Sequence, residues 1–390
     1  MDGEFDELIL FIREIFHKPE GVIPLHEPVF IGNEIQYVNN CISSTFVSSV
    51  GKYVDEFEIK TAEYTKSKHA IASVNGTAAL HIALKLAGVN NGDEVITQPL
   101  TFIATANAIS YCNANPVFID VDKDTMGLSP EKLESFLKKN TRYNKKIRKL
   151  INKESSKPIS AIVPMHTFGI PCRIEEIIEI ADRYYIPVIE DAAESLGSRC
   201  NNQHTGTFGK IGVLSFNGNK IITTGGGGMI LTDDIEIAKL AKHLTTQAKV
   251  PHPWEFFHDQ IGYNFRMPNI NAALGVAQIE MLDEFVRNKR NTSALYQTFF
   301  KEHNIHYFAE NKNCHSNYWL NTIALPSKTE RDSFLKASNS KGVMTRPAWT
   351  LMCNLPMYSK CQRDDLENAI ELESTVVNLP SSYRKKVDLN

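Results

Sequence analysis

Apolar residues recur along the chain with two different spacings, and these predict the order of strands and helices. Between residues 70 and 190, short apolar runs alternate with segments whose apolar residues return every three to four positions. The short runs predict strands at 70–74, 94–97, 116–119, 159–164 and 187–190. The periodic segments predict helices at 78–86, 104–111, 130–138 and 174–184. Such alternation predicts an α/β fold with a mostly parallel sheet flanked by helices, and functional residues just after the strands.

The pattern differs on either side of this region. Helices are predicted at 6–16, 34–41, 55–64 and 270–288, and strands at 304–308, 318–325 and 342–345. We therefore expect an N-terminal helix and arm over 1–30, a large domain over 31–265 and a smaller C-terminal α/β domain over 266–390. The basic segment 138–157 has few apolar residues, so we expect a solvated surface connection, with anion binding as the alternative.

Composition narrows the class of protein. Hydrophobic residues make up 42% of 390 residues, which is ordinary for a globular protein, and 45 acidic against 42 basic residues leave no positive charge to attract nucleic acid. No apolar run approaches the roughly 18 residues of a membrane span, and the acidic start Met1–Glu7 lacks the basic residues of a signal peptide. A cytoplasmic location is expected. The seven cysteines are odd in number and include no C-x-x-C pair, so we predict free thiols and no metal site.

The first motif with candidate chemistry runs from Ser73 to His81 and reads SVNGTAALH. It follows a predicted strand and opens a helix. Small residues there let a phosphate approach the backbone, and the N–H groups and dipole of a helix N-terminus favour an anion. A tight turn in which Thr77 caps the helix is the alternative. The motif is neither a Walker A loop nor a G-x-G-x-x-G fingerprint, which argues against a P-loop NTPase or an NAD enzyme.

The second motif runs from Val188 to Gly197 and reads VIEDAAESLG. An apolar strand ends in two carboxylates, and the two alanines after Asp191 leave room for a flat ligand. This carboxylate could ligate a metal, act as a base or pair with a protonated ring nitrogen. A carboxylate that caps a helix or a turn is the alternative.

The third motif, from Ser215 to Ile230, holds one lysine, Lys220, among small and apolar residues before a run of four glycines. A poorly solvated lysine has its free amine available for Schiff-base chemistry, whereas most lone lysines are simply exposed. The fourth motif, from Gly262 to Gly275, reads GYNFRMPNINAALG and starts the long predicted helix. Helix capping and close packing through small residues are its structural alternative.

In this order and spacing, the four motifs resemble the DegT/DnrJ/EryC1/StrS family of sugar aminotransferases, over about residues 23–380. The resemblance implies a fold type I pyridoxal-phosphate transferase. The segments 215–229, 243–254 and 345–352 are most similar to the aminotransferases of legionaminic-acid pathways, and perosamine-type synthases are near relatives.

The resemblance assigns the cofactor chemistry residue by residue. Lys220 matches the Schiff-base lysine, and Asp191 matches the carboxylate that faces the pyridinium nitrogen. Glu194 falls near the cofactor hydroxyl, where many members have Gln or His, although perosamine-type relatives also carry Glu. Gly226 replaces a glutamate that is common in the glycine run of the family. That departure puts the substrate in doubt more than the reaction.

The remaining cofactor contacts also follow from the resemblance. Gly76, Thr77 and Ser215 match the phosphate cradle, and Phe102 matches the aromatic side chain that stacks on the cofactor ring. Asn264 matches an asparagine that reaches the phosphate from the other subunit, so a homodimer with shared active sites is implied.

The implied reaction moves an amino group from L-glutamate to C4 of a nucleotide-linked 4-keto-6-deoxy sugar. A 2-acetamido sugar of the legionaminic-acid type is expected, and a GDP-linked perosamine precursor is the alternative. Arg346 is a candidate for the nucleotide diphosphate, because a guanidinium offers a fork of donors to phosphate; a surface ion pair is its alternative. His166 follows a predicted strand and is a candidate cleft residue, with a packed core histidine as the alternative. Two rival functions are a dehydratase, which has histidine at the position of Lys220, and a non-catalytic regulatory protein that keeps the fold.

Overall fold

The computed structural model describes residues 5–385, so most of the acidic start of the chain, residues 1–4, lies outside the described residues. Two hydrogen-bonded sheets, in the orders β1-β11-β10-β7 and β3-β2-β6-β5-β4, meet at bridges that join Ile162 to Val188 and Met165 to Asp191. Their strands are β1 (His69–Ser73), β2 (Glu94–Thr97), β3 (Asn115–Phe118), β4 (Thr141–Asn144), β5 (Lys149–Asn152), β6 (Pro158–Val163), β7 (Ile189–Asp191), β10 (Ile211–Ser215) and β11 (Gly228–Thr232). Apart from β11 and the β4–β5 hairpin, neighbouring strands are parallel, which confirms the mostly parallel sheet.

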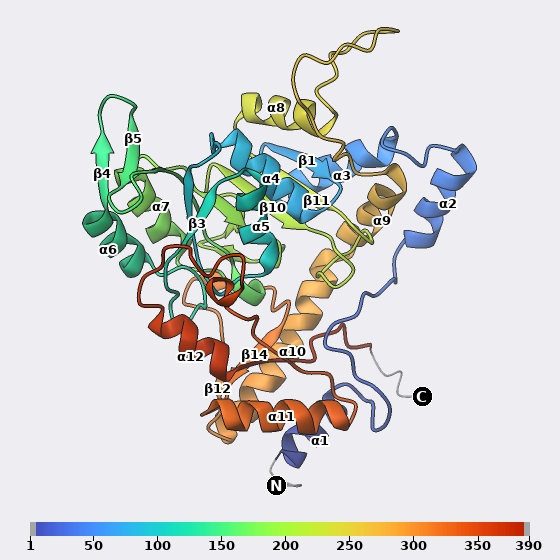
Figure 1. Cartoon of the computed structure of the whole chain (residues 1–390). Coiled ribbons are helices and arrows are strands. Elements are labelled where there is room, and N and C mark those ends of the chain that lie inside the picture. Colours follow the sequence, from blue (N-terminus) through green and yellow to red (C-terminus); the bar gives the residue numbers. More distant parts are fainter. Residues whose placement is uncertain (1–4, 386–390) are drawn as a thin grey trace.

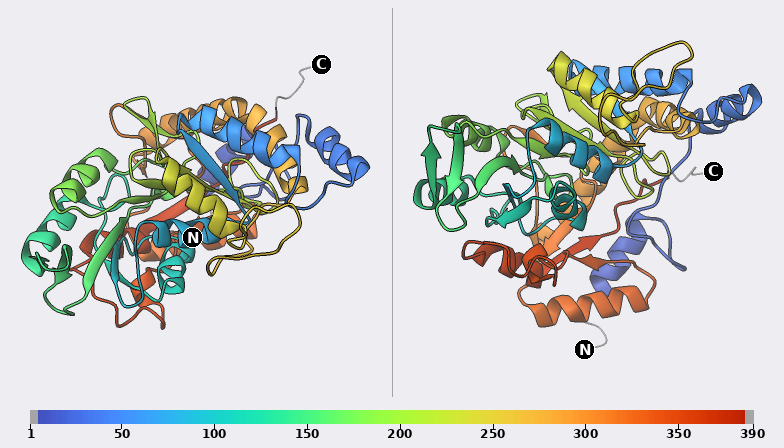
Figure 2. Two further views of the ribbon diagram at one scale, coloured as in Figure 1. Left: turned by 90° about the horizontal axis from the view of Figure 1, so that it is seen from above. Right: turned by 45° about the horizontal axis from the view of Figure 1, so that its top comes forward.

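Helices cover both faces of this sheet (Figures 1 and 2). They are α2 (Glu34–Ser44), α3 (Lys52–Thr65), α4 (Gly76–Leu86), α5 (Ile103–Tyr111), α6 (Pro130–Asn140), α7 (Ile174–Arg183), α8 (Ile235–Thr245) and α9 (Asn269–Glu280). Side chains alternate along β1: Ile71 packs in one core with α4 and α8, while Ala70 and Ala72 pack in another with α3 and α9. This two-sided burial explains why the predicted strands are continuous apolar runs.

A separate antiparallel sheet forms at the lower end of Figure 1, in the order β12-β14-β16-β15. Its strands are β12 (His306–Tyr307), β14 (Asn321–Ala324), β15 (Arg346–Pro347) and β16 (Val376–Leu379), and its helices are α10 (Leu282–Glu302), α11 (Lys328–Ser340) and α12 (Glu367–Thr375). The first helix, α1 (Asp6–Ile15), packs here as well. Its residues Ile9 and Ile12 share a core with Tyr296 of α10 and Val377 of β16.

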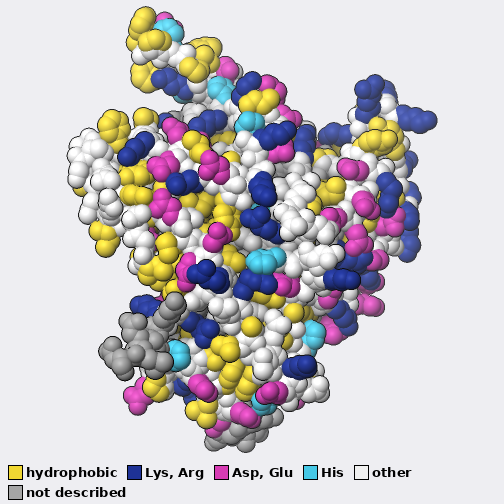
Figure 3. All heavy atoms as spheres, turned by 180° about the vertical axis from the view of Figure 1, so that it is seen from behind, with side chains coloured by type: hydrophobic (Ala, Val, Ile, Leu, Met, Phe, Trp, Pro, Cys, Tyr) yellow, Lys and Arg dark blue, Asp and Glu magenta, His cyan; other side chains and the backbone are white. Residues whose placement is uncertain are grey.

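Two expectations about local structure are wrong, and a third gains detail. The helix expected over 270–288 is two helices, because the chain turns at Met281 between α9 and α10. The strand expected over 342–345 is absent: Gly342 has a φ of +76° and ends the turn after α11, so Val343 makes a single bridge to Ile23 and the strand begins at Arg346. The basic segment 138–157 contains the β4–β5 hairpin, which extends the sheet edge and presents its Lys and Arg side chains outward (Figure 3, upper right).

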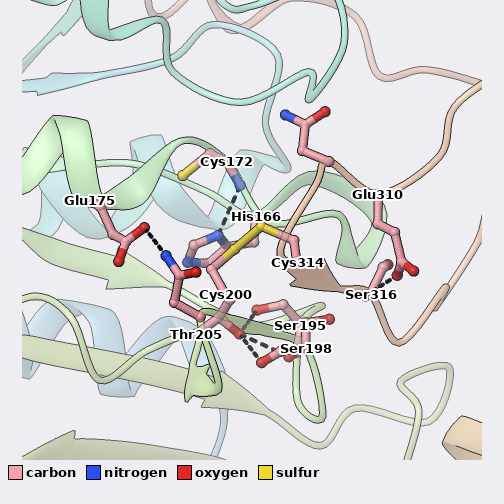
Figure 4. The surroundings of a disulfide bond; sticks show 12 residues. His166, Cys172, Glu175, Ser195, Ser198, Cys200, Thr205, Glu310, Cys314 and Ser316 are labelled. Carbon is pink, nitrogen blue, oxygen red and sulfur yellow. Dashed lines mark hydrogen bonds between the residues drawn. A yellow bond between two sulfur atoms is a disulfide. The ribbon is translucent and has the colours of Figure 1, made fainter.

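The prediction of free thiols is wrong for two cysteines. Cys200 of β8 (Arg199–Cys200) and Cys314 of β13 (Cys314–His315) form a disulfide across an antiparallel pair, with their Cα atoms 4.1 Å apart (Figure 4). They lie 114 residues apart in sequence, so no local spacing pointed to this pair. Strand β8 also pairs with β9 (Gln203–His204). The other five cysteines are free thiols.

Candidate active site

A cavity of about 320 Å³ opens where β1, β7 and β10 end. These strands run in the same direction, so the residues that follow them meet at one edge of the sheet. The cavity is lined by Asn75, Gly76, Thr77, Leu80, Phe102, Ala104, Met165, Asp191, Ala193, Glu194, Ser215, Asn217, Asn219, Lys220, Gly227, Trp319 and Trp349. A larger hollow of about 630 Å³ lies beside Tyr64 and Arg290 but contains none of the predicted site residues. The first cavity is therefore the candidate active site.

Asp191 is the buried carboxylate of this cavity, with an exposed fraction of 2%. Thr105 Oγ1 donates a hydrogen bond to its Oδ2 at 2.7 Å, and the Ala193 N–H donates to its Oδ1 at 3.2 Å. Burial raises the pKa of Asp191, while these two hydrogen bonds and the positive charge of Lys220 oppose that rise. The arrangement suits a carboxylate that pairs with a cationic group of a ligand.

Lys220 and Glu194 form an ion pair inside the cavity. The Lys220 Nζ lies 3.0 Å from Glu194 Oε1 and 4.2 Å from the centre of the Trp319 ring. The other oxygen of Glu194 accepts the Phe168 N–H at 3.0 Å. Burial raises the pKa of Glu194, and the charge and hydrogen bond of Lys220 oppose that rise. The lysine predicted to be poorly solvated is indeed largely buried, with a side-chain exposure of 12%.

The N-terminus of α4 forms one wall of the cavity. Asn75 caps this helix by accepting the Ala78 N–H at 2.8 Å, and Gly76 and Thr77 of the first turn line the cavity. The first N–H groups of a helix have no partner within the helix, so this end attracts an anion. A Cβ atom at Gly76 would lie 2.9 Å from the Ser215 Cβ, so only glycine lets the helix approach β10 this closely. Because its side chain accepts the Ala78 N–H, Asn75 and not Thr77 is the residue that caps α4.

Aromatic side chains enclose the remaining space. Phe102 precedes α5, is 48% exposed and lies 6.2 Å from Trp349, measured between ring centres. Trp349 in turn packs against Phe168 at 4.8 Å. Trp319 and Trp349 both line the cavity, and both come from the C-terminal part of the chain. This part therefore closes a cavity that is built mainly at the sheet edge.

Three predicted site residues do not line the cavity. The ring of His166 is fully buried; its Nδ1 accepts the Cys172 N–H at 3.2 Å, so its Nε2–H donates to Glu190 at 3.0 Å. The structure therefore favours the packed core histidine over the substrate contact. Arg346 is exposed and donates to the Asn339 side chain and the Thr345 carbonyl.

Asn264 is the third of these residues. It lies on the exposed connection between α8 and α9, where it forms a bridge with Thr246. Its side chain does not line the cavity of its own chain.

Sequence reasoning missed Thr105, Trp319 and Trp349. Thr105 lies one turn inside a helix whose start was predicted, but nothing local showed that its hydroxyl meets Asp191. The tryptophans lie in segments about 100 residues or more from Lys220 in the chain. The useful signal would have been their rarity, because the chain has only three tryptophans.

Comparison with known proteins decides the family. The model of the DegT/DnrJ/EryC1/StrS aminotransferase family matches residues 29–386. The chain belongs to this family. It is 38% identical over 360 residues to a GDP-perosamine synthase of Escherichia coli O157:H7, covering 92% of this chain and 93% of that protein. It is 37% identical over 337 residues to a putative pyridoxal phosphate-dependent aminotransferase of Bacillus subtilis, covering 86% and 84%.

Solved structures confirm the fold of this family member. A DegT/DnrJ/EryC1/StrS aminotransferase from Brucella abortus superposes with a TM-score of 0.82 at 26% identity, covering 90% of each chain. Among residues 5–385, no helix is long and apolar enough to cross a membrane.

The cofactor of this family member is pyridoxal phosphate, and the cavity fits it. The anion-attracting end of α4 and the hydroxyl of Ser215 suit the phosphate, and the buried carboxylate of Asp191 suits the ring nitrogen. Lys220 lines the same cavity and provides an amine.

Proposed function

We propose that this aminotransferase moves an amino group from L-glutamate to C4 of a nucleotide-linked 4-keto-6-deoxy sugar. The observation that carries the proposal is the convergence of Asp191, Lys220 and the α4 N-terminus on one cavity. A regulatory protein that merely kept the fold would not need a buried carboxylate, a buried lysine and an anion site together. A lysine rather than a histidine at position 220 argues against the dehydratase.

The residues of the cavity have separate roles in this proposal. When bound, pyridoxal phosphate supplies the electron sink that stabilises charge on the reacting carbon. Asp191 favours the protonated ring nitrogen, because its negative charge stabilises the positive form. The Lys220 amine would move a proton between the substrate carbon and C4′ of the cofactor, as general base at the first atom and general acid at the second. Glu194 Oε1 lies 3.0 Å from that amine and pairs with it.

Two sugars are candidates for the acceptor. Relatives named GDP-perosamine synthase, at 34–38% identity, support a GDP-linked 4-keto-6-deoxy sugar. The motif at 215–229 and the segments 243–254 and 345–352 support a 2-acetamido sugar of the legionaminic-acid type. Arg346 stays the predicted contact for the nucleotide diphosphate of either sugar. The cytoplasmic location of the enzyme also stays a prediction.

A panel of purified sugars tests this function. With L-glutamate as donor, we expect formation of 2-oxoglutarate and a 4-amino sugar from either the GDP-linked or the 2-acetamido substrate, measured by chromatography and mass spectrometry. The substrate with the higher kcat/KM identifies the pathway class, because kcat/KM reports differential binding of the transition state. No turnover with any nucleotide-linked 4-keto sugar in the panel would contradict the proposal.

The proposal includes a homodimer with shared active sites. The connection between α8 and α9 projects from the body as an arm, residues 246–264, whose tip carries apolar side chains (Figures 1 and 3). Trp254 and Phe256 on this arm are 75% and 81% exposed. On α2, Ile35 and Ile42 are exposed as well. Exposed apolar groups on the arm and on α2 support an interface with a second copy.

Mixed dimers test whether Asn264 serves the partner's cofactor. Lys220→Ala chains are inactive, and Asn264→Ala chains lose a hydrogen bond to the charged phosphate. That loss corresponds to about 1.5–3 kcal/mol, or roughly ten- to a hundredfold in cofactor affinity. If sites are shared, a mixed dimer has one site that lacks both residues and one intact site. At a cofactor concentration below the Kd of the Asn264→Ala chain, activity should therefore rise above that of either variant alone.

Subunit exchange is the control for this experiment. Native mass spectrometry of differently tagged chains establishes the fraction of mixed dimers, and a mixture of Lys220→Ala with unmodified chains sets the activity expected of one intact site. If exchange is complete and activity does not rise, Asn264 acts within its own chain and the shared-site model is wrong.

A further inference from the structure

The Lys220 amine has two partners with complementary chemistry. Glu194 Oε1 lies 3.0 Å from its Nζ, and the centre of the Trp319 ring lies 4.2 Å from the same atom. A carboxylate and the face of an aromatic ring both stabilise a cation. The two groups therefore form a pocket for an ammonium group.

One residue, Asn317, fixes both sides of this pocket. Its Nδ2 donates to the Glu194 and Leu196 carbonyls at 2.8 and 2.9 Å, and its Oδ1 accepts the Trp319 N–H at 2.8 Å. Asn317 is completely buried. It thus ties the segment before β14 to the loop after β7, and it sets the distance between Glu194 and Trp319.

Two further contacts hold the Trp319 ring. Its Nε1–H donates to the Asn219 carbonyl at 2.7 Å, next to Lys220 in the chain. The Trp319 carbonyl accepts a hydrogen bond at 3.1 Å from Lys289, a buried lysine whose other partner is the Ser381 carbonyl. Trp319 is therefore held through both its side chain and its backbone.

From this arrangement we infer that Glu194 and Trp319 form a dock that holds the Lys220 amine, as an ammonium, while the amine is not bonded to the cofactor. Asn317 is the positioning residue of the dock. The inference rests on the proposed role of Lys220 in transamination.

The dock gives the freed lysine a defined place during the reaction. A transaminating lysine is released from the cofactor, gains and loses a proton, and must then bond again. A flexible lysine side chain that left the cavity would lose about 2 kcal/mol of rotamer entropy on each return. Holding the amine between a carboxylate and a ring face keeps it within reach of the reacting carbon.

Acetylation of Lys220 tests the dock without turnover. The full-length enzyme is loaded with pyridoxamine 5′-phosphate, which cannot bond to the lysine, and is pulsed with acetic anhydride. Mass spectrometry of the Lys220 peptide, normalised to the exposed Lys239, gives the rate of acetylation. Only the uncharged amine reacts, so loss of a group that stabilises the ammonium accelerates acetylation. In Trp319→Leu we expect an increase of about two- to thirtyfold at pH 8.

Two further variants remove the other members of the dock. Glu194→Gln, which keeps its volume, should also accelerate acetylation at pH 8. Asn317→Ala should do so as well, because it releases both sides of the pocket. Circular dichroism and a melting curve check that each variant folds. If Asn317→Ala does not fold, the Trp319 and Glu194 variants still decide the question.

The pH dependence separates docking from simple access. If Trp319→Leu only opened the cavity, its acceleration would be the same at pH 8 and pH 10.5. If the dock stabilises the ammonium, the acceleration shrinks at pH 10.5, because stabilisation of the charged form matters less as the pH approaches the range in which lysines lose their charge. Trp349→Leu is the matched control for access: it removes a second tryptophan of the same cavity, which packs on Phe168. Any acceleration that it causes should be smaller than that of Trp319→Leu and the same at both pH values.

Three outcomes would overturn the inference. In the first, Lys220 is acetylated no faster in Trp319→Leu and Glu194→Gln than in the unmodified enzyme. In the second, the acceleration is the same at pH 8 and pH 10.5. In the third, Trp349→Leu accelerates acetylation as much as Trp319→Leu does. Borohydride reduction of the holoenzyme, followed by peptide mapping, separates this failure from failure of the proposed function. If another lysine carries the cofactor, the role of Lys220 in the proposed function fails. If Lys220 carries it but the variants acetylate like the unmodified enzyme, only the dock fails.

Discussion

Lys220→Ala is expected to fold and to keep the cavity, yet to lose transamination by about 10⁴-fold or more. The change removes both the amine that bonds to the cofactor and the group that moves the proton, and general acid–base catalysis alone contributes about 10²–10⁴-fold. It also leaves the Glu194 carboxylate, 3% exposed, without its cationic partner. Stopped-flow half-reactions with L-glutamate, followed by the visible absorbance of the bound cofactor, measure the loss.

Lys220→Arg is the control for this variant. It keeps a positive charge beside Glu194 but cannot act as an amine nucleophile or as a base near neutral pH. Both variants should therefore be inactive, whereas the arginine variant should melt closer to the unmodified protein. Substantial turnover by either variant would show that a different group carries the chemistry.

Asp191→Asn is expected to bind the cofactor and to lose most of its rate. The amide has nearly the shape of the carboxylate, but it carries no charge to stabilise a protonated ring nitrogen, so the electron sink weakens. An orienting carboxylate in a comparable catalytic role contributes about 10⁴-fold. Single-turnover rates with L-glutamate measure this effect separately from binding.

Thr105→Val gives a graded comparison for Asp191. It removes the hydroxyl that donates to Asp191 Oδ2 but keeps the carboxylate and the volume. A hydrogen bond to a charged group contributes about 1.5–3 kcal/mol, so we expect a loss of roughly ten- to a hundredfold, well below that of Asp191→Asn. Near-normal turnover by Asp191→Asn would show that another group stabilises the ring nitrogen.

Most of the parallel core was predictable because its information is local, but β10 (Ile211–Ser215) was not predicted. Strands buried on both faces are short apolar runs, and the predicted strand over 94–97 coincides with β2. Strand β11 was missed because it starts within the glycine run, at Gly228, where propensity argues against a strand. A Cβ atom at Gly228 would lie 2.5 Å from the Asn75 backbone, so tertiary packing requires glycine there.

The candidate site was predictable where its residues follow strands. Gly76 comes shortly after β1, Asp191 and Ser215 are the last residues of β7 and β10, and Lys220 follows β10. All four line one cavity. Trp319 could not be predicted in this way, because its place over Lys220 depends on Asn317 and Lys289. The Cys200–Cys314 pair was missed for the same reason: antiparallel strands far apart in sequence bring the two thiols together.

Lys289 is a second candidate for the lysine that bonds to the cofactor, because it is also buried. Burial lowers the pKa of Lys289 well below the ordinary value for lysine. A neutral buried amine is the usual description of a Schiff-base lysine. Yet Lys289 donates to two backbone carbonyls, of Trp319 and Ser381, and it does not line the cavity. Geometry therefore selects Lys220, although the lowered pKa belongs to Lys289.

Borohydride reduction of the purified holoenzyme decides between the two lysines. Reduction fixes the bond between the cofactor and its lysine, and mass spectrometry of the digested protein locates the adduct. The account predicts a single adduct on Lys220, and none after the enzyme has been treated with L-glutamate, which releases the lysine. An adduct on Lys289, or on any lysine outside the cavity, would contradict it.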